Sequence, residues 1–498
     1  MTRLSQQNLS QANAAVMLPD YRREDVTPGI VHLGVGAFQR AHVAAYIDGL
    51  LEHDPSWGIV GASLRRPDTR DALAPQDFLY TQVVREPSRT RARIIGSLLD
   101  VLDANTQREE LLALMAHPDI RIVSLTVTEK GYCHDPATGE LDEANPDIRH
   151  DLDHPRAPVT APGLIVEALR RRMEALVDPF AVMSCDNLPA NGVTTRRIVT
   201  RLAHLMSPVL GKYVEEAVVF PSTMVDRIVP ATTDEDRAET TALTGLEDAW
   251  PVVTEPFTQW VVENRFPGGR PPFEKGTAQL VEDVTPYETM KLRMLNGSHS
   301  TIAYLGYLAG KEHVADVVAV PEFRALIAAM MTDEIAPTLG MPKEETDAYR
   351  EKLLKRFANT ALKHRTWQIA MDGSQKLPQR LLNTIRARLR GERGIDRLAL
   401  GVAGWMRYVT GVGEDGTAIE VKDPLAARLR AIADGAGRDA GALVDGLLSV
   451  NEVFGDDLSA NPMFRGLLVE HVGSLLSKGA AATVREMAGA GDAAKLLG

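Results

Sequence analysis

The chain has 498 residues, too many for one ordinary hydrophobic core, so we expect two domains. Its net charge of −12, from 55 Lys and Arg against 67 Asp and Glu, argues against a nucleic-acid partner, which requires a basic surface. No apolar run approaches the length of a membrane span, and the N-terminal stretch MTRLSQQNLSQANAAVMLPD lacks the continuous apolar segment of a secretory signal.

The cysteine content is that of a protein in a reducing compartment. The chain contains 2 cysteines, Cys133 and Cys185, which lie far apart in apolar surroundings and cannot form a disulfide framework. No Cys/His spacing matches a structural zinc site. We therefore expect a cytoplasmic protein with no metal site.

Short apolar runs alternate with helix-like stretches such as 108–117 and 163–176 in the first half of the chain. The apolar runs are IVHLGVG (30–36), GIVGASL (58–64), RIVSLTV (121–127), FAVMSC (180–185) and AVVF (217–220). Continuous Val/Ile-rich strands alternating with helices are typical of a parallel sheet covered on both faces. The pattern predicts a doubly wound α/β domain.

The pattern changes at about residue 281, beyond which most stretches have helical spacing. The preceding segment ENRFPGGRPPFEKG (263–276) is rich in Pro and Gly and indicates an irregular connection. We predict an α/β domain over residues 1–280 and a mainly helical domain over residues 281–498.

The stretch HLGVGAFQRAH places two glycines, Gly34 and Gly36, directly after the first predicted strand and before a helix. Glycine at this point lets the backbone turn tightly and approach a pyrophosphate group. Gln39 stands where a G-x-G-x-x-G motif has its third glycine, so an ordinary strand-to-helix turn is the alternative. The strand before and the helix after favour a nucleotide site.

The second predicted strand is followed by Arg65, Arg66, Pro67 and Asp68. Asp68 is placed to accept the ribose hydroxyls of NAD, whereas the two arginines are suited to the 2′-phosphate of NADP. A solvated loop is the third reading. The sequence favours NAD and leaves NADP open.

Polar residues follow three of the predicted strands, at the sheet edge where ligands bind in open α/β folds. They are Thr128, Glu129 and Lys130 after the third run, Asp186, Asn187 and Asn191 after the fourth, and Thr223, Asp226 and Arg227 after the fifth. Each group alone fits turn chemistry. Their common placement predicts that some of them are functional.

The stretch KLRMLNGSHS places Lys291, Asn296 and His299 among apolar residues of a helix-like segment. Polar groups are costly to bury there unless they have partners or a function. One interpretation is a catalytic lysine with hydrogen-bonding neighbours. The alternative is a surface lysine followed by a helix-end Asn-Gly.

These motifs carry a family resemblance. HLGVGAFQRAH, SLTVTEKGY, CDNLPANG, STMVDRI and KLRMLNGSHS stand in the order found in the mannitol dehydrogenase family, and the chain resembles that family over nearly its whole length. It is similar to the fructuronate reductases (D-mannonate oxidoreductases) through TVTEKGYC, LNGSHSTIAYLGYLAG, HRTWQIAMDGSQKLPQR and LALGVAGWMRY. The resemblance implies a Rossmann-type domain, a helical domain and an active site in the cleft between them.

The resemblance also implies metal-independent NAD(P) chemistry with Lys291 as the acid/base. It makes Asn187 and Asn296 the residues that stabilise the oxyanion, His299 a substrate-positioning residue and Glu288 a proton relay. The cofactor residues that the motifs indicate are Gly34, Gly36, Ala37, Phe38, Arg40, Asp68 and Asp226.

The chemistry of a secondary alcohol supports this role for Lys291. Hydride removal requires that the hydroxyl proton be taken and the developing alkoxide be held. A free lysine, with a reference pKa of about 10.4, is only about one part in a thousand neutral near pH 7.4. A base at this position therefore needs a pKa lowered by roughly two to three units, which partial burial can produce.

The substrate is indicated by the stretch KHRTWQIAMDGSQK. Mannitol-type members often carry an Arg eight residues before its final lysine, where this chain has Gln368. Arg365 and Lys376 are candidate ligands for a hexuronate carboxylate, and ordinary salt bridges are the alternative.

The sequence therefore predicts the NAD-dependent interconversion of D-mannonate, oxidised at C5, and D-fructuronate in hexuronate catabolism. A mannitol or arabinitol dehydrogenase is the first alternative, and a dinucleotide-binding regulatory protein is the second. The expected partner is a small sugar acid or polyol, with no nucleic acid and no membrane. The oligomeric state is left open.

Overall fold

The structure, a computed structural model, describes residues 2–135 and 138–495. The chain forms two compact units, Met1–Thr285 and Pro286–Gly498. Within the described residues, no helix is long and apolar enough to cross a membrane.

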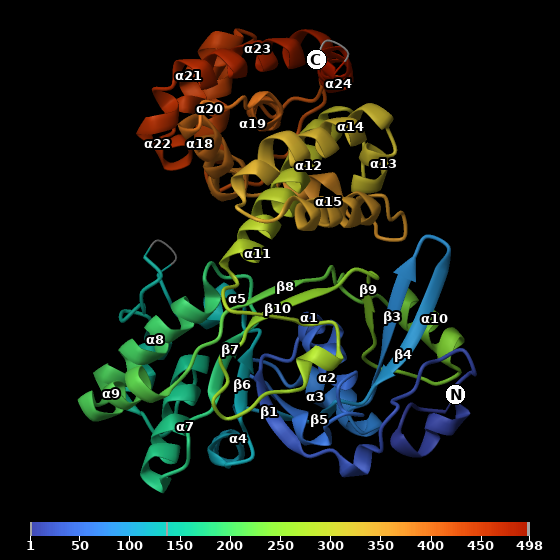
Figure 1. The fold of residues 1–498 in the computed structure, drawn as a ribbon, viewed down its shortest axis with the longest axis vertical. Coiled ribbons are helices and arrows are strands. Elements are labelled where there is room, and N and C mark those ends of the chain that lie inside the picture. Colours follow the sequence, from blue (N-terminus) through green and yellow to red (C-terminus); the bar gives the residue numbers. More distant parts are fainter. Residues whose placement is uncertain (1, 136–137, 496–498) are drawn as a thin grey trace. The chain divides into compact units, whose positions relative to one another are not determined.

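The first unit is built on a five-stranded parallel sheet (Figure 1). Its strands, in spatial order, are β5 (Leu98–Asp103), β2 (Gly58–Ser63), β1 (Pro28–Leu33), β6 (Ile122–Leu125) and β7 (Ala181–Ser184). Its helices are α1 (Ala37–Ala41), α2 (Val43–Asp48), α3 (Asp68–Leu73), α4 (Arg108–Ala116), α5 (Thr128–Gly131), α6 (Pro146–Asp153), α7 (Ala161–Ala175), α8 (Asn191–Met206), α9 (Pro208–Ala217) and α10 (Asp234–Thr244).

Both faces of this sheet are covered, which explains why its strands are apolar throughout. Val31 and Val60 pack in one core with α4, α7 and α8. The neighbouring residues Ile30 and Ile59 point to the opposite face and pack with α1, α2 and α3. The predicted doubly wound α/β domain is confirmed.

Two three-stranded sheets complete the first unit. One contains β3 (Tyr80–Glu86), β4 (Arg89–Ile95) and β9 (Val252–Thr254), and the other contains β8 (Thr223–Asp226), β10 (Gln259–Glu263) and β11 (Gln279–Val281). The prediction of a strand over 217–220 is wrong. Val219 accepts a hydrogen bond from the backbone N–H of Val182 in β7, but the assigned strand begins at Thr223 and pairs with β10.

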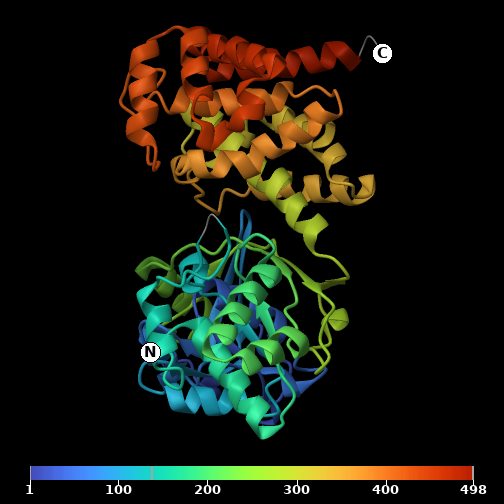
Figure 2. The same cartoon turned by 90° about the vertical axis from the view of Figure 1, so that its left-hand side faces the viewer.

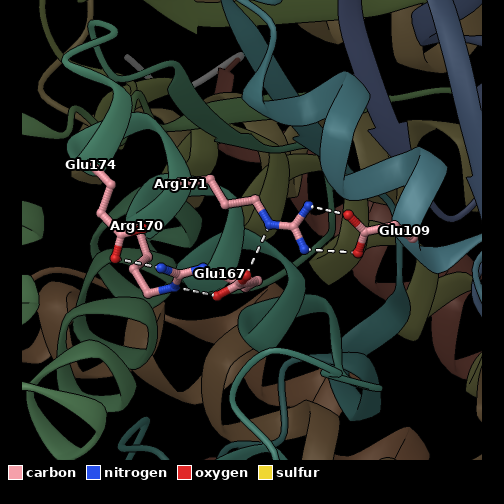
Figure 3. Close-up of polar contacts among 5 residues, drawn as sticks. All are labelled: Glu109, Glu167, Arg170, Arg171 and Glu174. Atoms are coloured by element: carbon pink, nitrogen blue, oxygen red, sulfur yellow. Dashed lines mark hydrogen bonds and ion pairs between the residues drawn. The ribbon is translucent and has the colours of Figure 1, made fainter.

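A network of ion pairs joins α4 to α7 (Figure 3). Glu167, whose side chain is 1% exposed, accepts from Arg170 Nε at 2.6 Å and from Arg171 Nε at 2.9 Å, and Arg171 also binds Glu109 on α4. Burial opposes ionisation of Glu167, yet the hydrogen bonds from the two arginines hold its pKa below the usual value. The network stabilises the packing of these helices, and each charged group named here has a partner of opposite charge.

The second unit consists of helices (Figure 2, yellow to red), with no strand assigned among its described residues. The α-helices are α11 (Thr285–Met290), which begins at the unit boundary, α12 (Gly297–Leu308), α13 (Val314–Val318), α14 (Pro321–Ala329), α15 (Lys343–Phe357), α16 (Thr366–Ala370), α17 (Gly373–Leu377), α18 (Asn383–Arg390), α19 (Asp396–Tyr408), α20 (Ala426–Ala436), α21 (Ala440–Leu448), α22 (Asn451–Ser459), α23 (Pro462–Lys478) and α24 (Ala480–Lys495). Three π-helices interrupt them: η6 (Lys291–Asn296), η7 (Met330–Ile335) and η9 (Pro378–Leu382).

Helix α12 forms the centre of this unit. It is buried on nearly all sides and packs against α16 and α19. Close packing with α19 depends on Gly401, because a Cβ there would lie 2.5 Å from Thr301 Oγ1. The segment that precedes α12 is therefore attached to a rigid part of the unit.

Candidate functional site

The loop after β1 has the form that a dinucleotide requires. Gly34 has φ of +94°, and a Cβ on it would lie 2.3 Å from the carbonyl oxygen of Thr126. Thr126, in the loop after β6, donates through Oγ1 to the carbonyl of Gly34 at 2.7 Å. Glycine is thus needed at position 34 for both the backbone conformation and the close approach of the two loops.

Gly36 meets a different requirement. It is exposed, it precedes α1, and a Cβ built on it would meet nothing within 4 Å. The backbone is therefore open at the end of the central strand β1, between β2 and β6, which is the place where doubly wound folds bind dinucleotides. This open cradle fits a pyrophosphate group.

The remaining predicted residues of this loop lie in α1. Ala37 and Phe38 are half-buried, and Phe38 stacks on His42 with ring centroids 4.9 Å apart. The side chain of Arg40 is buried, donates to the carbonyl of Trp250 and lies over the ring of Tyr80 at 5.3 Å. These contacts favour a supporting role for Arg40 over the direct cofactor contact that the motif indicates.

The end of β2 carries an ion pair. Arg66 donates through Nε to Asp68 Oδ2 at 2.8 Å, and Asp68 stands in the first turn of α3. Arg65 and Arg66 are exposed, whereas Asp68 is half-buried. This end of β2 is where the adenosine ribose lies in folds of this type.

The loops after β6 and β7 are held together by Asp186. Its carboxylate accepts from the backbone N–H groups of Val127 at 2.8 Å and Thr128 at 3.0 Å, and from the hydroxyl of Tyr132 at 2.8 Å. Thr128 has φ of +62°, a strained conformation for a β-branched residue. The hydrogen bonds to Asp186 hold this strained backbone at the edge of the sheet beside the glycine loop.

Asn191 connects the loop that carries the predicted residue Asn187 to the start of β8. Its amide donates to the carbonyls of Asp186 at 3.1 Å and Thr223 at 2.8 Å, and accepts from the backbone N–H of Thr223 at 2.9 Å. The loop that carries Asn187 is thereby fixed to β8, which ends at Asp226. Asn187 is exposed and Asp226 is buried.

In the second unit, Lys291 and Asn296 are the first and last residues of π-helix η6, and Glu288 precedes them in α11. The backbone N–H of Gly297 donates to the carbonyl of Leu292, five residues earlier, as a π-helix requires. Five residues of an α-helix turn through about 500°, which leaves the two ends about 140° apart. The wider π turn brings Lys291 and Asn296 nearer to one face of the helix.

His299 follows Asn296 by three residues, so the two lie on neighbouring positions of one helix face. The structure therefore brings Lys291, Asn296 and His299 together along one side of a single continuous helix. Lys291 and Asn296 are half-buried, and His299 is 8% exposed.

His299 has strongly basic surroundings. Its ring lies 4.8 Å from that of Phe357 and 5.1 Å from that of His364. Burial, followed by electrostatic interactions with the His364 imidazole and with the guanidinium groups of Arg356 and Arg380, holds the pKa of His299 well below its usual value. Burial and Arg356 likewise lower the pKa of His364 to about 4. Both imidazoles are neutral near pH 7.

The two predicted carboxylate ligands lie in different places. Lys376 donates through Nζ to the carbonyl of Met371 at 2.6 Å and lies 3.8 Å from Asp372, and burial and then Arg380 lower its pKa. Arg365 is exposed and lies 3.9 Å from a carboxylate oxygen of Glu312. Lys376 lies close enough to Arg380 for the positive charge of Arg380 to lower its pKa.

Sequence reasoning missed Arg356 and Arg380 as members of this group. The sequence signal for Arg380 was its spacing, because it follows Lys376 by four residues, about one helical turn. Among the residues that the structure describes, no group of three or more His, Cys, Asp or Glu side chains is arranged to hold a metal ion.

Comparison with known proteins places the chain in a family. The mannitol dehydrogenase Rossmann domain matches residues 28–275, and the mannitol dehydrogenase C-terminal domain matches residues 283–476. The chain is 48% identical over 480 residues to an uncharacterized oxidoreductase of Escherichia coli (strain K12), covering 96% of this chain and 98% of the relative.

Two further relatives have named activities. A D-mannonate oxidoreductase of Escherichia coli (strain K12) is 48% identical over 94% of this chain and 97% of its own length. The solved structure of Pseudomonas fluorescens mannitol 2-dehydrogenase, a ternary complex with NAD and D-mannitol, is 40% identical with a TM-score of 0.81, over 98% of this chain and 99% of that one. The chain is thus a dehydrogenase/reductase that acts on CH–OH groups and belongs to the mannitol dehydrogenase family.

Proposed function

We propose that this enzyme interconverts D-mannonate and D-fructuronate with NAD as cofactor. The observation that carries the proposal is the guanidinium of Arg380, which lies near His299 and donates to Ser300 but pairs with no carboxylate of the described residues. D-Mannonate has a carboxylate at C1 where mannitol has a hydroxyl, and a basic environment favours the anion. The 48% identity to a D-mannonate oxidoreductase supports the same substrate.

The first unit supplies the residues that would hold the cofactor. Gly34 and Gly36 form the turn and the open backbone for the pyrophosphate, Asp68 is placed to accept the ribose hydroxyls, and Asp226 would lie toward the nicotinamide. Asp68 favours NAD over NADP, which kinetics with both cofactors would compare. Bound NAD accepts the hydride from the alcohol carbon, and NADH returns it.

The chain's own residues manage the proton and the charge on oxygen. In oxidation, Lys291 Nζ takes the C5 hydroxyl proton while the carbinol hydrogen leaves as hydride and the C=O bond forms. The side-chain amides of Asn187 and Asn296 donate to the developing alkoxide without adding a competing base. Neutral His299 positions the substrate by hydrogen bonding, and Glu288 passes the proton from Lys291 to solvent. In reduction, the Lys291 ammonium protonates the carbonyl oxygen.

The alanine variants of the two glycines in the loop after β1 should both bind NADH more weakly, but they should differ in thermal stability. Gly36→Ala should unfold at the wild-type temperature, because its Cβ enters open space, but should raise the Kd for NADH at least about tenfold by occupying the approach of the pyrophosphate. Gly34→Ala should lower the melting temperature as well. Thermal unfolding and nicotinamide fluorescence titration measure both effects. Unchanged NADH affinity in Gly36→Ala would remove this loop from the cofactor site.

The substrate proposal is tested by initial rates of NADH oxidation with D-fructuronate and with D-fructose at matched concentrations. We expect kcat/KM to be at least about 100-fold higher for D-fructuronate, equivalent to roughly 2.7 kcal/mol of transition-state stabilisation. Comparable values, or a preference for D-fructose, would instead identify a polyol dehydrogenase like the Pseudomonas fluorescens relative.

A further inference from the structure

Arg380 lies beside the helix that carries the predicted catalytic residues. It belongs to π-helix η9, which packs against η6. The approach is close because Gly297, the residue after Asn296, has no side chain: a Cβ there would lie 2.7 Å from the carbonyl oxygen of Arg380. The backbone of Arg380 is thereby fixed against the start of α12.

The guanidinium of Arg380 is poorly satisfied by the protein. It donates through Nη1 to Ser300 Oγ at a long 3.3 Å, and no carboxylate of the described residues lies within ion-pair distance of it. A guanidinium has five N–H donors, so most of those on Arg380 remain available. The side chain is half-buried, which leaves these donors accessible to a ligand.

Arg172 shows how this protein satisfies a structural arginine. Arg172 is buried, and its guanidinium donates to the carbonyls of four residues. These acceptors are Met115, Asp178, His117 and Ile120. Arg380 lacks such a set of acceptors, although its position in the fold is equally well defined.

The positive charge of Arg380 acts on the titratable groups around it. Burial lowers the pKa of Arg380, and its positive charge contributes to lowering the pKa values of both His299 and Lys376. A guanidinium keeps its proton at physiological pH even so. An anion bound here would restore the missing partner and lie next to His299.

We propose that Arg380 binds the carboxylate of the substrate through two parallel N–H donors and thereby sets the preference for a sugar acid over a polyol. This assignment rests on the proposed function. The planar fork of a guanidinium matches a carboxylate in geometry as well as in charge. Lys376 is already bound to the carbonyl of Met371, and Arg365 lies beside Glu312, so neither is as available as Arg380.

The test compares Arg380→Met, Arg380→Lys and the control Arg428→Met, at an exposed arginine of α20 that pairs with Glu452, in steady-state reduction of D-fructuronate and D-fructose. Arg380→Met should lower kcat/KM for D-fructuronate at least about 100-fold, mainly through KM, and change that for D-fructose less than about threefold. Arg380→Lys keeps the charge but loses the fork, and should lose about tenfold on D-fructuronate. Arg428→Met should change kcat/KM for neither substrate by more than about threefold.

Thermal unfolding of each variant separates loss of binding from loss of fold. Equal losses on both substrates in Arg380→Met and Arg380→Lys, or no loss on either, would overturn the assignment. If the wild-type enzyme prefers D-fructuronate and Arg380→Met keeps that preference, the assignment of Arg380 fails while the proposed function stands. If the wild-type enzyme itself prefers D-fructose, the proposed function fails.

Discussion

Lys291→Ala is expected to lower kcat by about 10⁴-fold in both directions while changing the Kd for NADH less than about threefold. The amine is the group that exchanges a proton with the reacting hydroxyl, and a positioned acid/base contributes up to about 10⁴-fold. The cofactor loop lies in the other unit of the chain, so its folding does not depend on this side chain. Steady-state kinetics and fluorescence titration of NADH measure the two effects separately.

The pH dependence should have opposite signs in the two directions. Oxidation of D-mannonate needs the neutral amine and should become faster as pH rises, whereas reduction of D-fructuronate needs the ammonium and should become slower. The pH dependence of both the oxidation rate and the reduction rate should disappear in Lys291→Ala. Added methylamine should restore part of the activity. Substantial activity of Lys291→Ala at every pH would show that another group is the acid/base.

Asn296→Ala is expected to lower kcat by about 10²–10³-fold and change KM less than about threefold. The amide of Asn296 would donate to an oxygen that becomes negative only in the transition state, so its loss affects the chemical step more than binding. Asn451→Ala, which alters an exposed asparagine at the start of α22, provides the control and should leave both constants unchanged. A rise in KM with unchanged kcat would assign Asn296 to ground-state binding instead.

The parallel sheet could be predicted from the sequence because its strands are buried on both faces, which makes them apolar throughout. The same pattern, a continuous run of apolar residues, led to the wrong prediction of a strand at 217–220. Val218 and Phe220 are buried as their hydrophobicity requires, but the chain achieves this in an extended segment that precedes β8. Hydrophobicity predicts burial, and it does not determine which backbone groups pair in a ladder.

The predicted catalytic set could be found from the spacing of Lys291, Asn296 and His299, but its geometry could not. A lysine five residues before an asparagine lies on a different face in an ordinary α-helix, whereas the π-helix that contains both brings them nearer to one face. Arg380 was missed for a related reason. The sequence alone does not show which arginines have carboxylate partners: Arg171 binds Glu167 in its own helix, but its second partner, Glu109 on α4, is supplied by the tertiary fold.

The most direct test of the proposed reaction is to reduce D-fructuronate with NADH that carries deuterium in both C4 positions, and to locate the label in the product by NMR. We expect D-mannonate with one deuterium at C5, formed by the wild-type enzyme and not detectably by Lys291→Ala. Deuterium at another carbon, or no labelled D-mannonate from an enzyme that reduces D-fructose, would contradict it.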